Sequence, residues 1–330
     1  MKKVINQPNN VIEDMVKGMA LANEAQWQRI EGTNVIRRKE LSPGKVGIVS
    51  GGGSGHEPAH AGYVGKGMLD AAVVGEVFTS PTPDQIFEAI KAVDQGNGVL
   101  LVVKNYTGDV LNFEMAGELA EAEGIRVEQV VVSDDIAVKD SDNTIGRRGV
   151  AGTVFVHKTA GAKAEQGASL DEVKASAEKT ITQVRSMGMA LSPCIVPDAG
   201  KPSFHLEEDE MEIGIGIHGE AGTERKKIAS AQEIAEELTN HILEDSGLSA
   251  GDEVVVMING MGSTPEMELF IVNGHVNDLL NEKNISIHDT YVGEFMTSLE
   301  MAGFSITLLK VDTEIKQLLA EASEAVAFRV

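Results

Sequence analysis

The sequence predicts an α/β protein of two domains, each a mixed or mostly parallel sheet covered by helices. From about residue 45 to 156, short β-branched runs alternate with amphipathic helical stretches, which is typical of this fold class. A similar alternation resumes beyond residue 210. The 330 residues exceed what one ordinary core holds. We therefore expect one domain at residues 1–190 and a smaller one at residues 191–330.

The first domain is expected to contain four strands and their covering helices. Continuous apolar runs indicate strands that are buried on both faces, and they lie at residues 46–49, 71–74, 99–103 and 127–132. Pro83 or Asp84 begins a helix, because proline favours the first helical turn and the following apolar residues have helical spacing. Helices are also expected at residues 11–30 and 170–189.

The second domain repeats the pattern on a smaller scale. Proline and glycine residues between positions 192 and 202 mark the connection to it. We expect the substrate site between the two domains. The expected strands lie at residues 211–218, 253–258, 285–287 and 304–309, and the expected helices at 230–243, 265–280 and 314–327.

Charge and cysteine content exclude several classes of function. The net charge of -23 repels polyanions, which argues against nucleic acid and against anionic membrane surfaces as partners. Cys194 is the single cysteine, so no intramolecular disulfide forms and a reducing cytoplasm is expected. We find no signal peptide pattern and no apolar stretch long enough to span a bilayer. Small molecules or other proteins are the expected partners.

The segment IGIGIHG at residues 213–219 is predicted to be a strand with two unlike faces. Its isoleucines point into a core, while Gly214, Gly216 and His218 share the opposite face. Glycine weakens a strand, so two of them indicate close approach by a ligand or another backbone, with the imidazole beside it. The alternative is a histidine satisfied by local hydrogen bonds.

A glycine-rich loop is expected after the first strand, where open α/β sheets bind ligands. Residues 50–58 are SGGGSGHEP, whose glycines expose backbone N–H groups. The spacing matches neither common nucleotide-binding glycine motif, so a small polar substrate is favoured, with a flexible turn as the alternative. His56 is the candidate acid or base. His60 would share a helix face with His56, but no further ligand cluster supports a metal site.

A third polar segment, KNYTGD at residues 104–109, follows the expected strand at 99–103. Lys104 and Asp109 are its reactive residues. Asp109 either caps the following helix or takes a proton at the top of the sheet. Loops after neighbouring strands would bring His56 and Asp109 into one crevice, which suits activation of a substrate hydroxyl. His218 would face the same crevice from the second domain.

Five motifs, in this order, resemble the dihydroxyacetone kinases and in particular their substrate-binding subunit, DhaK. The resemblance spans nearly the whole chain, and the order and spacing of the motifs are more specific than any single glycine loop. The motifs are SGGGSGHEP at 50–58, FTSPTPD at 78–84, KNYTGD at 104–109, GRRG at 146–149 and GIHGE at 216–220.

The resemblance implies covalent capture of the substrate. The imidazole of His218 would form a hemiaminal with the carbonyl carbon of dihydroxyacetone, which excludes glycerol because glycerol has no carbonyl. His56 and Asp109 would assist deprotonation of the hydroxyl that receives the phosphoryl group. The residues implied to bind substrate are Gly53, Ser54, His56, Lys104, Asp109 and His218.

The resemblance also implies the phosphoryl donor. No Walker loop or helical nucleotide-binding domain is seen in the sequence, so the chain resembles the separate subunit of the bacterial phosphotransferase-dependent system. We therefore expect no cofactor on this chain. ADP and Mg²⁺ would lie on a helical subunit of the DhaL type, recharged from phosphoenolpyruvate through a phosphohistidine protein of the DhaM type. A homodimer is also implied.

Two departures from the family pattern bear on partner contacts rather than on the substrate motifs. They are Asp142-Asn143 before the GRRG motif and the ending AFRV at residues 327–330. A second function class therefore stays open, because some similar proteins bind dihydroxyacetone as coactivators of a transcription factor without kinase activity. A sensor needs capture but no proton transfer, so the presence of both His56 and Asp109 favours the kinase subunit.

Arg147 and Arg148 have two interpretations. They either supply positive charge to the site or form a structural ion-paired set near Asp134 and Asp135. The sequence does not choose between them.

Overall fold

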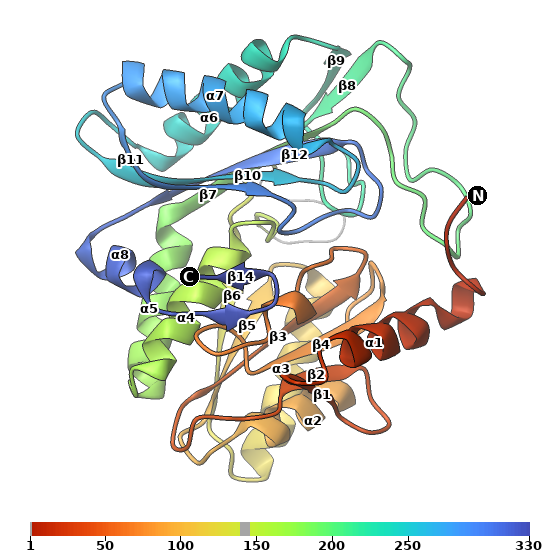
Figure 1. Cartoon of the computed structure of the whole chain (residues 1–330), viewed down its shortest axis with the longest axis vertical. Helices are drawn as coiled ribbons and strands as arrows, with labels where there is room; N and C mark the ends of the chain where they lie inside the picture. Colours follow the sequence, from red (N-terminus) through yellow and green to blue (C-terminus); the bar gives the residue numbers. More distant parts are fainter. Residues whose placement is uncertain (1, 139–145) are drawn as a thin grey trace.

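The computed structural model describes residues 2–138 and 146–330, and in this part of the chain two six-stranded sheets lie one above the other (Figure 1). Helices cover both faces of the lower sheet and the outer face of the upper one. The expected fold class, two α/β units each built on a sheet, is confirmed. Among the described helices, none is both long and apolar enough to cross a membrane.

The lower sheet is parallel at its centre and antiparallel at one edge. Its order is β1-β2-β4-β3-β5-β6, in which the last four strands are parallel and β1 and β2 are antiparallel to their neighbours. The four strands expected in the first domain are present as β3 to β6. Its strands are β1 (Trp27–Arg29), β2 (Val35–Arg38), β3 (Gly47–Ser54), β4 (Ala71–Val77), β5 (Val99–Lys104) and β6 (Val127–Val132).

The upper sheet is mostly antiparallel. Its order is β11-β10-β12-β7-β8-β9, and within it only β10 and β11 pair in parallel. A small hairpin, β13 (Glu324–Ala325) and β14 (Phe328–Arg329), lies outside both sheets. The strands of the upper sheet are β7 (Val184–Ala190), β8 (Glu210–Ile213), β9 (Glu224–Lys227), β10 (Glu253–Gly260), β11 (Ser286–Gly293) and β12 (Gly303–Lys310).

Several helices begin at the caps that their sequences provide. Pro83 opens α2 as expected, and Ser169 and Ser230 each form a capping box at the start of α5 and α6. Short 3-10 turns lie at Pro8–Asn10 and Ala61–Tyr63. The α-helices are α1 (Val11–Ala22), α2 (Pro83–Val93), α3 (Thr107–Ala122), α4 (Thr153–Glu165), α5 (Leu170–Gln183), α6 (Ala231–Ser246), α7 (Glu266–Glu282) and α8 (Thr313–Ala320).

The expected helix at residues 170–189 is wrong in its second part. Helix α5 ends at Gln183, and β7 follows at once, pairing with β12 on one side and β8 on the other. The upper sheet therefore begins at Val184, before the expected domain boundary at residue 190. Pairing with β12, more than a hundred positions away, decides this structure, and residue spacing does not encode such pairing.

The two ends of the chain also depart from expectation. Helix α1 ends at Ala22, and Trp27 starts a strand instead of continuing a helix to residue 30. Helix α8 ends at Ala320 rather than at residue 327. The hairpin that follows contacts the lower unit, where the Glu324 N–H donates to the Lys66 carbonyl over 3.0 Å. The C-terminal segment thus packs on the first unit rather than on the second.

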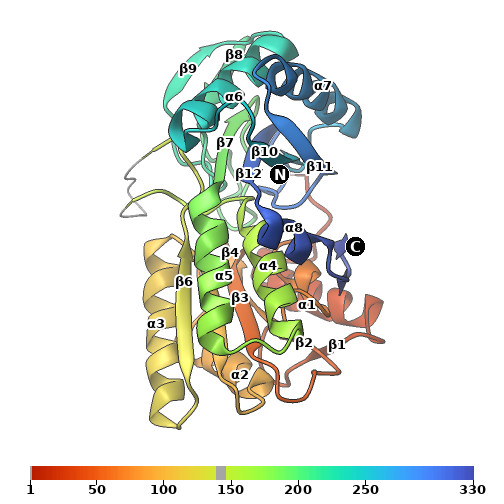
Figure 2. The same cartoon turned by 90° about the vertical axis from the view of Figure 1, so that its left-hand side faces the viewer.

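One apolar core is shared by the two units. Strand β10 alternates between two cores: Val254 and Val256 face the core beneath α6 and α7, whereas Val255 and Met257 join the core of the lower unit. Helices α4, α5 and α8 supply side chains to this shared core, and Figure 2 shows α4 and α5 alongside the lower sheet. Because apolar packing continues from one sheet to the other, the loops at the junction are held in fixed relative positions.

Helix α4 lies inside the molecule. Apart from Lys163 and Glu165, every residue of the helix is buried. A Cβ added at Gly161 would lie 2.5 Å from the Met68 carbonyl oxygen and closer still to Met68 Cα. Only glycine allows the backbone at Met68 to approach the helix this closely.

Substituting Gly161→Ala should lower the free energy of unfolding by about 1–3 kcal/mol, because the new methyl group has no space against a backbone segment. The matched control is Gly274→Ala in α7, where a Cβ meets nothing within 4 Å. That variant should be neutral or stabilised by roughly 0.5–1 kcal/mol, since glycine is a poor helix former. Denaturant unfolding followed by circular dichroism measures both; equal effects of the two substitutions would contradict the close approach.

Two buried histidines, His60 and His157, lie beside the glycine-rich strand β3. His157 of α4 and His60 are within hydrogen-bonding distance, with His60 Nδ1 3.0 Å from His157 Nε2. Burial, with a contribution from the charge of Lys104, lowers the pKa of His157 to about 3. The pKa of His60 is also lowered well below its usual value, mainly by burial. Both rings are therefore neutral in the folded protein near neutral pH.

These neutral rings predict loss of stability in acid. The unfolded chain protonates His157 near pH 6.5, whereas the folded chain does not until about pH 3, so stability is full above pH 6.5 and falls as pH drops through this window. Between pH 7 and pH 5, His157 alone should remove about 2 kcal/mol. Urea unfolding of the wild type and of His157→Gln at the two pH values isolates the contribution of His157 to the change in unfolding free energy. An identical pH dependence in both would show that His157 is not buried as a neutral ring.

Candidate active site

Two histidines from different units meet at the junction of the sheets. His56 follows β3 in the lower unit, and His218 lies in the loop between β8 and β9 of the upper unit. Their Nε2 atoms are 3.0 Å apart, although 162 positions separate them in the sequence. The two histidines that were expected to face one crevice are therefore in direct contact.

The ring of His56 is held on two sides. Its Nδ1 lies 2.8 Å from the Thr297 carbonyl oxygen, and it stacks on Phe78 with ring centroids 5.0 Å apart. A carbonyl only accepts, so Nδ1 carries the proton and a neutral His56 directs the Nε2 lone pair toward His218. Burial, the charge of Lys104 and the neighbouring His218 together lower the pKa of His56 well below its usual value. His56 is suited to accept a proton transiently and release it again.

His218 is held in the same way by a carboxylate. Its Nδ1 lies 2.8 Å from Glu220 Oε1, and the Tyr106 ring packs edge-on at 4.7 Å between centroids. With both Nδ1 atoms donating elsewhere, a hydrogen bond between the two Nε2 atoms needs one proton held between the rings. Removal of that proton would leave a lone pair on His218 facing the crevice.

Lys104 and Asp109 are buried close to this pair. Lys104 ends β5, and Asp109 lies in the first turn of α3. Burial raises the pKa of the Asp109 carboxyl, and the charge of Lys104 partly offsets this effect. No side chain caps α3, so the capping alternative for Asp109 does not hold. Asp109 Oδ1 is buried without a hydrogen-bond partner, which leaves it available to a ligand.

Residues 50–54 of the expected glycine loop are the end of strand β3, and only residues 55–58 lie beyond it. A Cβ at Gly51 would lie 2.5 Å from the Val73 carbonyl oxygen, and one at Gly53 would lie 2.5 Å from the Thr79 nitrogen. These glycines admit neighbouring backbone, a sufficient reason for their presence. The Ser54 hydroxyl donates to the Gly75 carbonyl over 2.6 Å, so it points to the adjacent strand.

The strand expected at residues 211–218 ends at Ile213. Gly214 has φ +76°, a left-handed conformation that turns the chain out of the sheet. The isoleucines in this segment are buried as expected. The space at Gly216 is filled by the side-chain atoms Glu220 Oε2 and Arg148 Nη1, where a ligand or another backbone was expected. At Gly214 a backbone atom does approach, because a Cβ there would lie 3.2 Å from the Thr223 nitrogen.

His60 does not share a helix face with His56. The segment between them forms turns, and His60 instead points to His157. Within the described residues, no group of three or more His, Cys, Asp or Glu side chains is arranged to hold a metal ion.

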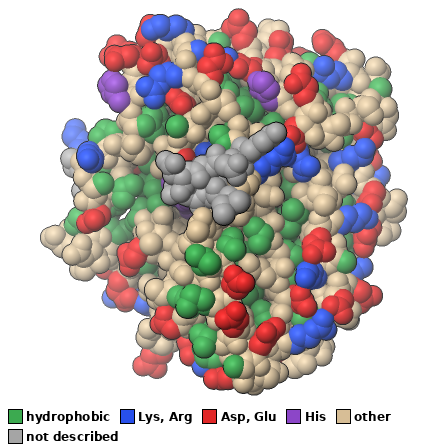
Figure 3. Space-filling model, turned by 180° about the vertical axis from the view of Figure 1, so that it is seen from behind, with side chains coloured by type: hydrophobic (Ala, Val, Ile, Leu, Met, Phe, Trp, Pro, Cys, Tyr) green, Lys and Arg blue, Asp and Glu red, His purple; other side chains and the backbone are tan. Residues whose placement is uncertain are grey.

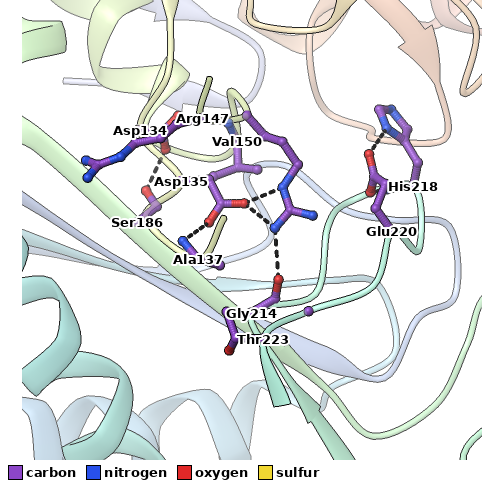
Figure 4. Close-up of polar contacts among 12 residues, drawn as sticks. Asp134, Asp135, Ala137, Arg147, Val150, Ser186, Gly214, His218, Glu220 and Thr223 are labelled. Carbon is purple, nitrogen blue, oxygen red and sulfur yellow. Dashed lines mark hydrogen bonds and ion pairs between the residues drawn. The ribbon is translucent and has the colours of Figure 1, made fainter. Parts of the chain in front are cut away.

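Both arginines of the GRRG motif form structural ion pairs, and the charge of Arg148 also acts on Glu220. Arg148 is fully buried and pairs with Asp135 at 2.7 Å, and it also donates to the Gly214 carbonyl (Figure 4). Arg147 forms an ion pair with Asp245 of α6. The hydrogen bond from Arg148 to Gly214 and the ion pair from Arg147 to Asp245 connect the two units. The departure at residues 142–143 lies outside the described residues.

Four site residues were missed by sequence reasoning. Glu220 lies within the GIHGE motif, and its spacing of two from His218 was the available signal. Tyr106 lies inside the KNYTGD motif and packs on His218. Phe78 has φ +55°, and Thr297 contributes a backbone carbonyl. Neither a backbone conformation nor a long-range carbonyl contact is visible in the sequence.

Comparison with known proteins identifies the family. Residues 17–327 match the family model described as the Dak1 domain. The chain is 60% identical over 314 residues to a Listeria innocua protein named PTS-dependent dihydroxyacetone kinase 1, dihydroxyacetone-binding subunit DhaK, and the match covers 95% of each chain. It is 44% identical over 338 residues to the Escherichia coli PEP-dependent dihydroxyacetone kinase, dihydroxyacetone-binding subunit DhaK, again over 95% of each.

Solved structures of similar proteins have the same fold as this chain. The dihydroxyacetone kinase operon co-activator Dha-DhaQ superposes with a TM-score of 0.91 at 39% identity, covering 96% of this chain and 97% of that one. The dihydroxyacetone kinase from C. freundii, in complex with AMP-PNP and Mg²⁺, superposes with a TM-score of 0.92 at 34% identity, covering 99% of this chain and 61% of that one. The chain therefore belongs to the Dak1 family, the family of the DhaK subunits of dihydroxyacetone kinases.

Proposed function

We propose that this chain is the dihydroxyacetone-binding subunit of a phosphoenolpyruvate-dependent dihydroxyacetone kinase. The contact between His56 Nε2 and His218 Nε2, with Asp109 and Lys104 buried nearby, is the observation that carries this proposal. In this proposal, His218 is the nucleophile, and His56 and Asp109 are the proton acceptors beside it. The kinase-subunit names of its full-length relatives support the same function.

Capture is proposed to occur through His218. The Nε2 lone pair adds to the carbonyl carbon, so that an N–C bond forms and the π electron pair of the carbonyl moves to its oxygen. The oxygen takes the proton that the two imidazoles shared, which returns His56 to its neutral form. A ketose fits this chemistry, whereas glycerol offers no carbon that the nitrogen can attack.

Phosphorylation is proposed to use Asp109, assisted by His56. The unpaired Asp109 Oδ1 accepts the proton of the terminal hydroxyl as that oxygen attacks the donor phosphorus. A raised pKa brings this carboxylate closer to neutral pH, where a base transfers protons most effectively. Capture by His218 holds the hydroxyl in place, which reduces the entropic cost of the transfer.

The phosphoryl donor is proposed to be the phosphorylated form of an ADP that a helical DhaL-type subunit holds with Mg²⁺. A DhaM-type phosphohistidine protein would rephosphorylate that ADP after each transfer. One surface favours such a partner. The helix that carries Asp109 exposes Leu111, Met115 and Leu119, spaced by one turn each. Figure 3 shows this face, with apolar side chains among acidic ones on the lower unit. We also propose a homodimer and a cytoplasmic location.

A coactivator function remains the second candidate, because the solved co-activator Dha-DhaQ has nearly the same fold at 39% identity. A sensor requires capture of the ligand but no phosphoryl transfer. Turnover therefore separates the two functions.

Native mass spectrometry should show a reversible adduct between the wild-type chain and dihydroxyacetone, because Nε2 of His218 faces the crevice. His218→Ala should lose the adduct, and glycerol should give none with either protein. The control His205→Ala, at an exposed surface histidine, should retain it. A His218→Ala variant that still forms the adduct would place the nucleophile elsewhere.

Dihydroxyacetone phosphorylation should occur when the chain is mixed with ADP-loaded helical partner, phosphohistidine protein and phosphoenolpyruvate. Asp109→Ala and His56→Ala should each lower turnover by roughly 10²–10⁴-fold, the usual contribution of a positioned acid or base. Phosphoenolpyruvate consumption measures the rate. Adduct formation without turnover by the wild type would instead favour the coactivator.

A further inference from the structure

Glu220 is the side chain that contacts His218 on the side away from His56. Its Oε1 lies 2.8 Å from His218 Nδ1, and its Oε2 accepts the backbone N–H of His218 over 2.9 Å (Figure 4). Both carboxylate oxygens are thus occupied by one residue, two positions earlier in the chain. The side chain of Glu220 is only 10% exposed. The proposed capture steps do not use Glu220 as a proton acceptor or as a nucleophile.

The fold keeps Glu220 ionised despite its burial. Burial alone raises the pKa of a carboxyl group, but the charge of His218 and its hydrogen bond, together with Arg148, reverse this effect and lower the pKa of Glu220 to about 2. Arg148 Nη1 is buried without a hydrogen-bond partner. Asp135 and the Gly214 carbonyl occupy the other guanidinium nitrogens and hold that arginine in place.

Gly216 makes room for this arrangement. The two atoms nearest to a Cβ built at Gly216 are Glu220 Oε2 and Arg148 Nη1, the latter at 2.5 Å. Any larger side chain would displace the carboxylate, the guanidinium or both. The carboxylate of Glu220 therefore occupies a position that exists only because residue 216 is a glycine.

We propose that Glu220 is a positioning residue that fixes the proton of His218 on Nδ1, orients the ring and balances the positive charge that the ring acquires on capturing a carbonyl. This inference rests on the function proposed above. It assigns Glu220 no contact with substrate. The carboxylate acts through the imidazole alone.

The chemistry of capture explains why a carboxylate is needed. A neutral imidazole has one N–H and one lone pair, and only the nitrogen with the lone pair attacks. A proton on Nδ1 leaves Nε2 as the nucleophile. Once the N–C bond has formed and the former carbonyl oxygen has taken its proton, the ring is an imidazolium that retains its Nδ1–H. A carboxylate 2.8 Å from Nδ1 stabilises this charge at short range in a buried setting.

Glu220→Gln tests this role with little change of shape. An amide has one acceptor oxygen, whereas Glu220 accepts two N–H groups. If the oxygen keeps the backbone N–H, the amide nitrogen donates to Nδ1 and forces the ring proton onto Nε2, where it blocks attack. The matched control is Glu212→Gln. Glu212 is a buried carboxylate of β8 that accepts the Gly222 N–H and pairs with Arg225, without contacting His218.

Two measurements are made on the full chain. Nitrogen-15 NMR of the histidine rings, with the His218 signals assigned by their loss in His218→Ala, reports which nitrogen carries the proton. Native mass spectrometry across dihydroxyacetone concentrations reports capture. We expect His218 Nδ1 to carry a proton in the wild type and in Glu212→Gln, in addition to the proton that Nε2 shares with His56 in the absence of ligand. In Glu220→Gln, the proton should move to Nε2 and half-maximal capture should need roughly 10- to 100-fold more ligand, as for other groups that orient a functional histidine.

Glu220→Asp keeps the charge and should recover part of the capture, which also provides a test if the glutamine variant does not fold. Wild-type tautomer and wild-type capture in Glu220→Gln, or no capture in Glu220→Asp alongside full capture in a folded Glu220→Gln, would overturn the inference. Absence of capture by the wild type would instead refute the proposed function. The NMR comparison would still decide whether Glu220 sets the tautomer.

Discussion

Packing between the two sheets is the constraint on which the site depends. Val255 and Met257 of β10 enter the same core as the lower sheet and α4, so the two units share buried surface across their junction. Densely packed interiors have little freedom to slide. That rigidity holds His56 Nε2 of one unit 3.0 Å from His218 Nε2 of the other, although 162 positions separate the two residues in the sequence. Loosening of the shared core would therefore be expected to affect the site as well as stability.

Close backbone approach is the second theme of the structure, and it explains much of the glycine content. Gly51, Gly53 and Gly161 each face backbone atoms of another segment, and Gly216 faces Glu220 and Arg148. None of these four positions needs a ligand to explain it. The glycines allow neighbouring strands and loops to approach closely at the base of the site.

Local charge in the site differs from the charge of the whole molecule. The chain carries a net charge of -23, yet the buried cations Lys104 and Arg148 lie close to carboxylates of the site. Asp109 and Glu220 face these cations and have opposite pKa directions: burial prevails at Asp109 and raises its pKa, whereas the charge of His218 prevails at Glu220 and lowers its pKa. One carboxylate is thereby suited to accept a proton and the other to remain ionised.

The sequence by itself determined the α/β class, the central strands of the lower sheet and the candidate residues His56, Asp109 and His218, because apolar runs and polar strand ends are local patterns. It did not determine β7, whose apolar spacing resembles that of a helix. The strand forms because it pairs with β12, which is a long-range interaction. Only the tertiary structure decided that Gly216 serves Glu220 and that Thr297 holds His56. These contacts join segments far apart in the chain or depend on backbone turns, and residue order carries no direct record of either.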